Sequence, residues 1–110
     1  MTRPPPTGDD LVRVLAALAN PHRLRVFAAL SHGRNYVSAL ARELGISRPL
    51  LQVHLRKLEA AGLVRAQMEL SEEGKAMNYY EIVPFSIELS AVAIARAARD
   101  LTGKPGGDDK

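Results

Sequence analysis

The stretch that decides the fold runs from Val37 to Val64 and reads VSALARELGISRPLLQVHLRKLEAAGLV. It holds two short amphipathic patterns separated by Gly45, a residue that supplies the left-handed backbone needed for a sharp exit from a helix. The second pattern opens at Ser47 and spaces three apolar residues along one side of a helix: Leu51, Leu55 and Leu58. The opposite side then carries Arg48, Gln52 and Arg56. We therefore predict a helix-turn-helix whose second helix, over residues 48–61, reaches a DNA groove.

The sequence before this stretch predicts two further helices. Asp9 or Asp10 can cap the first, which ends near Asn20 and has an apolar face of Leu11, Val14, Leu15 and Leu18. Asn20 followed by Pro21 is a good start for the second, which we expect to continue until the pair His32-Gly33.

The sequence after Gly62 predicts a hairpin and a last helix. The apolar period shortens from 3.6 to 2, which indicates a strand over residues 64–70, a turn at 72–75 and a returning strand over 77–83. Pro84 is then expected to open a helix that reaches about Leu101, with apolar residues at coiled-coil-like spacing: Ile87, Ala91, Ile94, Ala98 and Leu101. The predicted fold is mostly α with a small β-hairpin, a winged helix-turn-helix of about five helices and a two-stranded wing.

Length and composition limit the classes of protein. At 110 residues the chain has the size of one domain, expected over residues 9–101 between disordered tails at 1–8 and 102–110. There is no cysteine, so disulfides and thiolate metal sites are excluded. No apolar run approaches the roughly 18 residues of a membrane span, and the Pro-rich first ten residues lack the apolar core of a signal peptide. We expect a cytoplasmic protein with no membrane partner.

The charge is distributed unevenly along the chain. Between Arg13 and Arg65 there are nine basic residues and two acidic ones, whereas from Ala66 onward there are five basic and eight acidic residues. The helix-turn-helix lies inside the basic segment, and clustered cations are the electrostatic footprint of a protein that displaces counterions from phosphates. A solvated charged surface is the alternative reading of the same pattern.

Three segments together resemble one family. LANPHRLRVFAAL, residues 18–30, resembles the second-helix signature of the ArsR/SmtB group of bacterial repressors, and residues 40–64 resemble its helix-turn-helix. Glu73-Gly74-Lys75 with Asn78-Tyr79-Tyr80 is similar to the wing of that group, so that the resemblance covers roughly residues 11–101. The acidic pair Glu72 and Glu73 departs from the more basic wings of many relatives and argues against deep insertion into a minor groove.

The resemblance implies a homodimer that places two recognition helices in successive major grooves of a palindromic operator and blocks transcription. Packing also favours a dimer, because the first and last helices carry apolar faces that a domain of this size cannot cover by itself. An intramolecular alternative lays the last helix over the core. The expected dimer interface comprises Leu11, Val14, Leu15, Leu18, Ile87, Ala91, Ile94, Ala98 and Leu101.

Individual residues of the recognition helix can be given roles. Its amino-terminal end attracts phosphate, Gln52 can pair with adenine, and Arg56 can pair with guanine or phosphate. His54 matches a histidine common in the family but lies beside the apolar stripe, which leaves packing and phosphate contact equally open. The expected DNA-binding residues are Ser47, Arg48, Pro49, Gln52, Val53, His54, Arg56 and, in the wing, Lys75.

Other functions find less support in the sequence. The metal sites of the family would fall at Tyr36 and Ser38, and at Pro84, Ser86, Ala97 and Asp100, where only Asp100 could act as a ligand; we predict no metal and no cofactor. No nucleophile and base are grouped as in an enzyme. Two alternatives to a DNA-binding repressor remain: a winged-helix subunit that works with a protein co-regulator, and a metal sensor with a site of His, Asp and Glu ligands.

Overall fold

The structure, a computed structural model, describes residues 6–102. Its contacts divide the chain into two compact units, one formed by the described residues up to Ala16 and from Ser86 onward, the other by Ala17–Phe85. Most of the predicted tails, residues 1–5 and 103–110, lies outside the described residues. The extent of a single domain over residues 9–101 stays a prediction, and each unit is described by itself.

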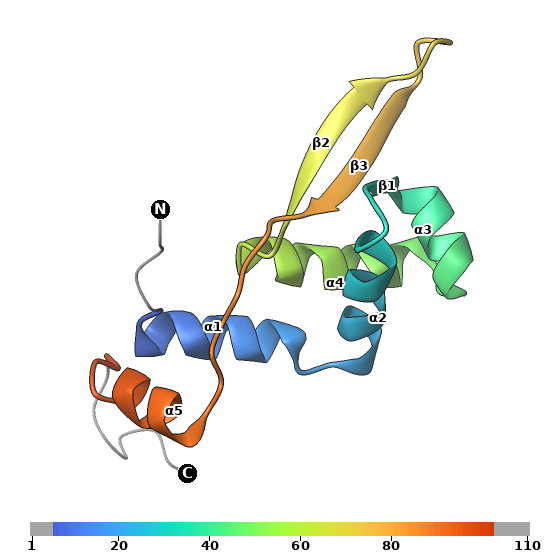
Figure 1. Cartoon of the computed structure of the whole chain (residues 1–110). Coiled ribbons are helices and arrows are strands. Elements are labelled where there is room, and N and C mark those ends of the chain that lie inside the picture. The colour runs from blue at the N-terminus through green and yellow to red at the C-terminus, as the bar shows by residue number, and fades with distance from the viewer. Residues whose placement is uncertain (1–5, 103–110) are drawn as a thin grey trace. The chain divides into compact units, whose positions relative to one another are not determined.

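The larger unit contains the predicted helix-turn-helix and hairpin (Figure 1). Its helices are α2 (Pro21–Leu30), α3 (Val37–Leu44) and α4 (Arg48–Ala60). Strands β2 (Val64–Leu70) and β3 (Ala76–Ile82) pair in antiparallel register from Val64 opposite Ile82 to Leu70 opposite Ala76. A short strand not expected from the sequence, β1 (Asn35–Tyr36), pairs with β3 on its other side and makes the sheet three-stranded, in the order β1-β3-β2.

Local side-chain chemistry sets the boundaries of these helices. Asn20 Oδ1 accepts hydrogen bonds from the amides of His22 (2.8 Å) and Arg23 (3.2 Å), which caps α2 as predicted. Gly45 ends α3 with φ of 69°, in the left-handed region that favours glycine. Ser47 Oγ then accepts from the amide of Leu50 at 3.2 Å and opens α4.

The core of the larger unit forms on one side of α4. The side chains of Leu51, Leu55 and Leu58 are fully buried, as are Val26 of α2 and Leu40 of α3. The apolar stripe predicted from the sequence is therefore the surface by which α4 packs on its neighbours. Because this stripe is buried, the remaining side of α4 faces outward.

The smaller unit shows that α1 (Gly8–Leu18) begins earlier than expected. The amide of Asp10 donates to Thr7 Oγ1 at 3.0 Å and the amide of Thr7 donates to Asp10 Oδ2 at 3.4 Å, so Thr7 caps the helix, and the predicted cap at Asp9 or Asp10 is wrong. Asp9 instead accepts from the amide and hydroxyl of Thr102, and Asp100 accepts from the amide of Gly8 at 2.6 Å. These bonds join the start of α1 to the end of the described chain.

The last helix is shorter than predicted. α5 spans Ala91–Ala98, and Ser90 caps it by accepting from the amide of Ala93 at 3.1 Å. Residues 84–90 are not helical, so a helix opening at Pro84 is wrong, and Ile87 and Leu101 both lie outside α5. The apolar residues between Ile87 and Leu101 match a helical spacing. The helix nevertheless begins later, because the Ser90 side chain accepts a hydrogen bond from a free amide of its first turn.

His54 is the buried polar side chain of this core, with 6% of its surface exposed. Arg23 Nη1 lies 3.3 Å from His54 Nδ1, Arg23 Nε donates to the carbonyl of Ala17 at 2.6 Å, and the ring of His22 stacks on that of His54 at 5.3 Å. His54 Nε2 has no hydrogen-bond partner among the described residues. Burial first, and then the charge of Arg23, lower the pKa of His54 from its ordinary value.

Acid is therefore expected to destabilise the protein through His54. Because its pKa is lower in the folded chain than in the unfolded chain, only the unfolded chain takes up this proton as the pH falls below about 6.5. The free energy of unfolding should decrease across that window, and His54→Gln should remove this part of the decrease. Urea denaturation between pH 7.5 and 5 measures it, with the exposed His32→Gln as the control. An unchanged pH dependence in His54→Gln would contradict this account.

Candidate nucleic-acid interface

The outward side of α4 carries most of the predicted DNA-binding residues. Ser47, Arg48 and Pro49 are exposed at the start of the helix, Gln52 is half-buried, and Val53 and Arg56 are exposed one and two turns later. Among the described residues, no ion pair engages a cation of α4, since the ion pairs present join Arg13 to Asp10, Arg34 to Glu69, and Arg65 to Glu81. The two arginines of this side are thus available to phosphates or base edges.

His54 is the exception among the predicted DNA contacts. Its ring is buried against α2, as described above, and does not reach the outward side of the helix. Of the two roles that the sequence left open, the structure gives it the packing role. The predicted phosphate contact of this side chain is therefore wrong, because its ring nitrogens lie inside the protein.

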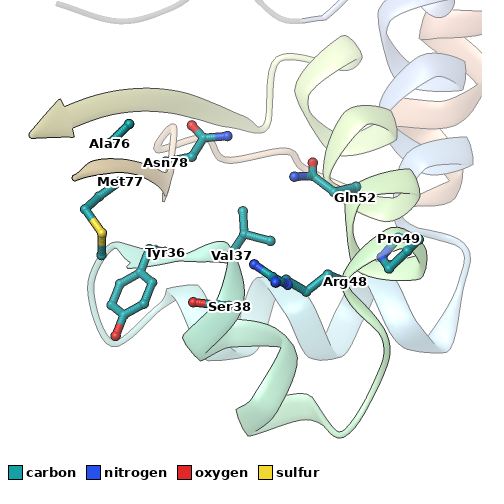
Figure 2. Close-up of a pocket in the computed structure, with 9 residues that line it drawn as sticks. All are labelled: Tyr36, Val37, Ser38, Arg48, Pro49, Gln52, Ala76, Met77 and Asn78. Carbon is teal, nitrogen blue, oxygen red and sulfur yellow. The ribbon is translucent and has the colours of Figure 1, made fainter.

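An open hollow of about 580 Å³ lies between the start of α4, the start of α3 and the wing (Figure 2). Figure 2 shows the amides of Gln52 and Asn78 facing one another across it, while the guanidinium of Arg48 reaches toward Ser38. Three residue types meet here, a cation, amides and hydroxyls, which are the groups that proteins use on nucleic-acid backbones and base edges. Its lining comprises Tyr36, Val37, Ser38, Arg48, Pro49, Gln52, Ala76, Met77 and Asn78.

Six residues of this lining were not identified as site residues from the sequence: Tyr36, Val37, Ser38, Ala76, Met77 and Asn78. Tyr36 and Ser38 reach the hollow because β1 pairs with β3, placing Tyr36 opposite Tyr79. That pairing is non-local and only two residues long, so periodicity could not reveal it. The available signal was the tyrosine-rich returning strand, whose aromatic side chains need a partner surface.

The wing is held to the segment just before α3 by interactions on one face of the sheet. The guanidinium of Arg34 donates to both carboxylate oxygens of Glu69, at 2.6 and 3.0 Å, and its carbon lies 4.1 Å from the centre of the Tyr79 ring. The rings of Tyr36 and Tyr79 meet edge to face at 5.7 Å. A bidentate ion pair over an aromatic ring fixes direction as well as distance, so these contacts orient the wing relative to α3.

Lys75 lies in the turn of the wing and is not part of the hollow. Its amide donates to Ser71 Oγ at 3.0 Å, and Gly74 beside it has φ of 81°. Glu72 and Glu73 are exposed in the same turn. The end of the wing therefore carries one cation and two carboxylates.

The predicted dimer residues differ in exposure. Leu11 is buried in the single chain, as is Ala97 of α5, and therefore belongs to the interior of the smaller unit. Val14, Leu18 and Ile87 are half-buried. The predicted positions that are exposed are Leu15, Ala91, Ile94, Ala98 and Leu101.

Two features that bear on other functions are absent from residues 6–102. No three His, Asp or Glu side chains come together there as ligands of a metal ion. None of the helices in that range is both long enough and apolar enough to cross a membrane.

Comparison with known proteins agrees with this geometry. A family model described as a helix-turn-helix domain matches residues 18–67. An uncharacterized HTH-type transcriptional regulator of Methanocaldococcus jannaschii, MJ0229, is 38% identical over 76 residues, which are 69% of this chain and 79% of that protein. The HTH-type transcriptional regulator Rv0324 of Mycobacterium tuberculosis is 29% identical over 103 residues, 88% of this chain but 46% of that protein. This chain thus spans less than half the length of the second relative.

Solved structures show the same fold. The homodimeric winged helix-turn-helix DNA-binding domain Mb0332 of Mycobacterium bovis, described as a possible ArsR-family transcriptional regulator, is 32% identical, with 83% of this chain and 70% of that chain covered and a TM-score of 0.60. HlyU of Vibrio cholerae is 25% identical, with 83% and 87% covered and a TM-score of 0.60. This chain belongs to the ArsR family of winged helix-turn-helix transcriptional regulators.

Proposed function

We propose that this regulator is a homodimeric repressor that binds a palindromic operator through α4 and the wing. The observation that carries the proposal is the outward side of α4, where Arg48, Gln52 and Arg56 stand opposite a fully buried leucine stripe. A helix with this division presents its polar side to a major groove while its apolar side holds it to the protein. A repressor acts by occupying the operator, and that requires no chemistry beyond this contact.

The side chains of this surface are suited to different parts of the duplex. Arg48 and the exposed Ser47 stand at the helix start, beside the hollow, where a phosphate can be met by a guanidinium and hydroxyls. Gln52, Val53 and Arg56 follow along the helix and suit base edges and a thymine methyl group. Pro49 adds an apolar contact, and Lys75 suits a phosphate beside the wing.

The homodimer is supported by the surface of the smaller unit. This unit exposes several large apolar side chains, Val12, Leu15, Leu89, Val92, Ile94 and Leu101, of which Val92 is 66% exposed. An apolar surface of this kind on a small unit is typical of a subunit interface. The related domain Mb0332 is itself described as homodimeric.

One prediction of this proposal concerns the recognition helix. Arg48→Ala and Gln52→Ala should each weaken binding to a duplex by about 1–3 kcal/mol, because each removes a contact to a base edge or phosphate. The duplex is one recovered with the wild-type protein from a random-sequence pool, and fluorescence anisotropy at several salt concentrations measures the affinity. Arg99→Ala, which removes the same charge at the end of α5, is the control and should bind as the wild type does.

Three results would contradict the proposed operator-binding repressor. A selection that enriches no sequence, with wild-type affinity equal for all duplexes, would exclude an operator-binding repressor. Equal losses in Arg48→Ala and Arg99→Ala would mean that only overall charge matters. Co-purification of an equimolar partner together with no footprint on DNA would instead favour the alternative of a subunit that acts through a protein co-regulator.

Another prediction of this proposal concerns the dimer. Ile94→Glu should shift the protein from dimer to monomer, because a carboxylate would be buried in an apolar interface without a partner. Sedimentation velocity measures the change in mass, and Met68→Glu, which places the same charge on an exposed apolar residue of the wing, should leave the dimer intact. A monomeric wild type, or a dimeric Ile94→Glu, would count against this interface.

A further inference from the structure

Two large apolar side chains of the wing stand in solvent. Met68 is 64% exposed and Leu70 is 74% exposed, and both belong to β2 near its end. They lie on one face of the hairpin, since they are two residues apart in the strand. No other part of the larger unit covers them, because the hairpin projects beyond α4 at this point (Figure 1).

The register of the hairpin shows which face this is. Met68 pairs with Asn78 and Leu70 pairs with Ala76, and directly paired residues project from the same face of a sheet. Asn78 and Ala76 both line the hollow that Arg48 and Gln52 share. The apolar pair therefore continues the surface that carries the recognition residues, one step farther along the wing.

The same face is buried at the base of the wing. Val64 and Tyr80 project from it there, with 2% and 5% of their surfaces exposed, and the face loses its cover only toward the turn. The opposite face carries Met77, the ring of Tyr79 and two ion pairs, which join Glu69 to Arg34 and Arg65 to Glu81. The two ion pairs of the wing thus lie on the face opposite to the exposed apolar pair, and that pair shares its own face with Asn78 and Ala76 of the hollow.

We propose that Met68 and Leu70 contact the walls of a DNA minor groove and make the affinity depend on the sequence that flanks the contacts of α4. This inference rests on the proposed function. Apolar side chains in a minor groove exchange water for sugar carbons and favour steps that open easily, so they read deformability without donating a hydrogen bond to a base. Occupancy by DNA is favoured by the continuity of this face with the hollow, where the cation and amides lie.

The charges of the turn determine how far the wing can enter. Glu72 and Glu73 follow Leu70 closely and are repelled by phosphates, whereas Lys75 is attracted. The apolar pair lies closer to the body of the unit than these carboxylates do. The contact is therefore shallow, with Met68 and Leu70 against the groove walls and the turn outside.

The test uses the full chain and duplexes that keep the selected core but vary the flanking bases reached by the wing. The double variant Met68→Ala, Leu70→Ala should bind the preferred duplex about tenfold more weakly and should lose the difference between flanks. Its dependence on salt should equal that of the wild type, because apolar contacts release no counterions. Both residues are exposed, so thermal unfolding should confirm an unchanged fold.

Two control variants separate the contribution of charge from the contribution of the apolar surface. Lys75→Ala should reduce the slope of log affinity against log salt by roughly 1 while keeping the preference for flanks. Exchanging the apolar side chains, Met68→Leu with Leu70→Met, should retain most of both affinity and preference, since the apolar surface is kept. Retention of preference in the exchange variant but not in the alanine variant supports the proposal.

Failure of this inference differs from failure of the proposed function. If the alanine variant binds every flank as the wild type does while Arg48→Ala loses affinity, the repressor stands and the apolar contact is wrong. That result would leave the apolar pair to a protein partner. If the wild type prefers no flank at all, the inference is overturned as well, and if it binds no duplex, both proposals are.

Discussion

Burial of one side of α4 is the constraint on which the rest of the structure depends. Leu51, Leu55 and Leu58 are fully removed from solvent, and each such side chain contributes about 1.5–3 kcal/mol relative to an exposed one. A rotation of α4 about its axis would expose this stripe, so the rotation is fixed. Because the helix has about 3.6 residues per turn, fixing the leucines also fixes where Arg48, Gln52 and Arg56 point. The geometry of the candidate interface is in this sense a consequence of the core.

A polar contact adds direction to this apolar packing. Leucines can slide along a neighbouring helix at small cost, whereas the contact of Arg23 with His54 Nδ1 requires one position of α4 relative to α2. Arg23 also donates to the carbonyl of Ala17, the first residue of the larger unit, so the same guanidinium contacts both the start of this unit and α4. The contact needs His54 to be neutral, and burial favours that form. Neutral His54, a residue that does not itself face outward, is therefore the form that fits this contact between α2 and α4.

The parts of the fold that could be predicted are those with local causes. Helices α2 to α4 have a cap or a glycine beside an apolar period, as Asn20, Gly45 and Ser47 show, and the hairpin has a period of 2. The last helix was predicted too long because residues 87–101 match a helical spacing, while the stronger local signal, the cap at Ser90, was overlooked. Strand β1 was missed because two residues show no period and its partner lies far along the chain.

The residues of the candidate site also divide into those placed by local causes and those placed by distant pairing. The outward residues of α4 could be assigned because the apolar stripe on one side implies a polar side opposite. The side chains that β1 and β3 bring to the hollow could not, since their position depends on the pairing of distant strands. His54 shows the limit of a helical pattern: a residue on the flank of a stripe can face either way, and its contact with Arg23 of another helix decides the matter.

Attraction to phosphate and fit to the shape of a groove come from different parts of the interface. Arg48 and Arg56 of α4 take part in none of the ion pairs among the described residues, whereas Arg34, next to β1, and Arg65 of β2 are neutralised by carboxylates on β2 and β3. Attraction to phosphate therefore comes mainly from the helix, and it depends on salt but not on sequence. The wing, residues 64–82, holds two basic and four acidic residues, so it adds nothing to the non-specific attraction of phosphates. What it can add is a fit to one shape of groove, and such a contribution improves the discrimination between sites because it leaves binding to all other DNA almost unchanged.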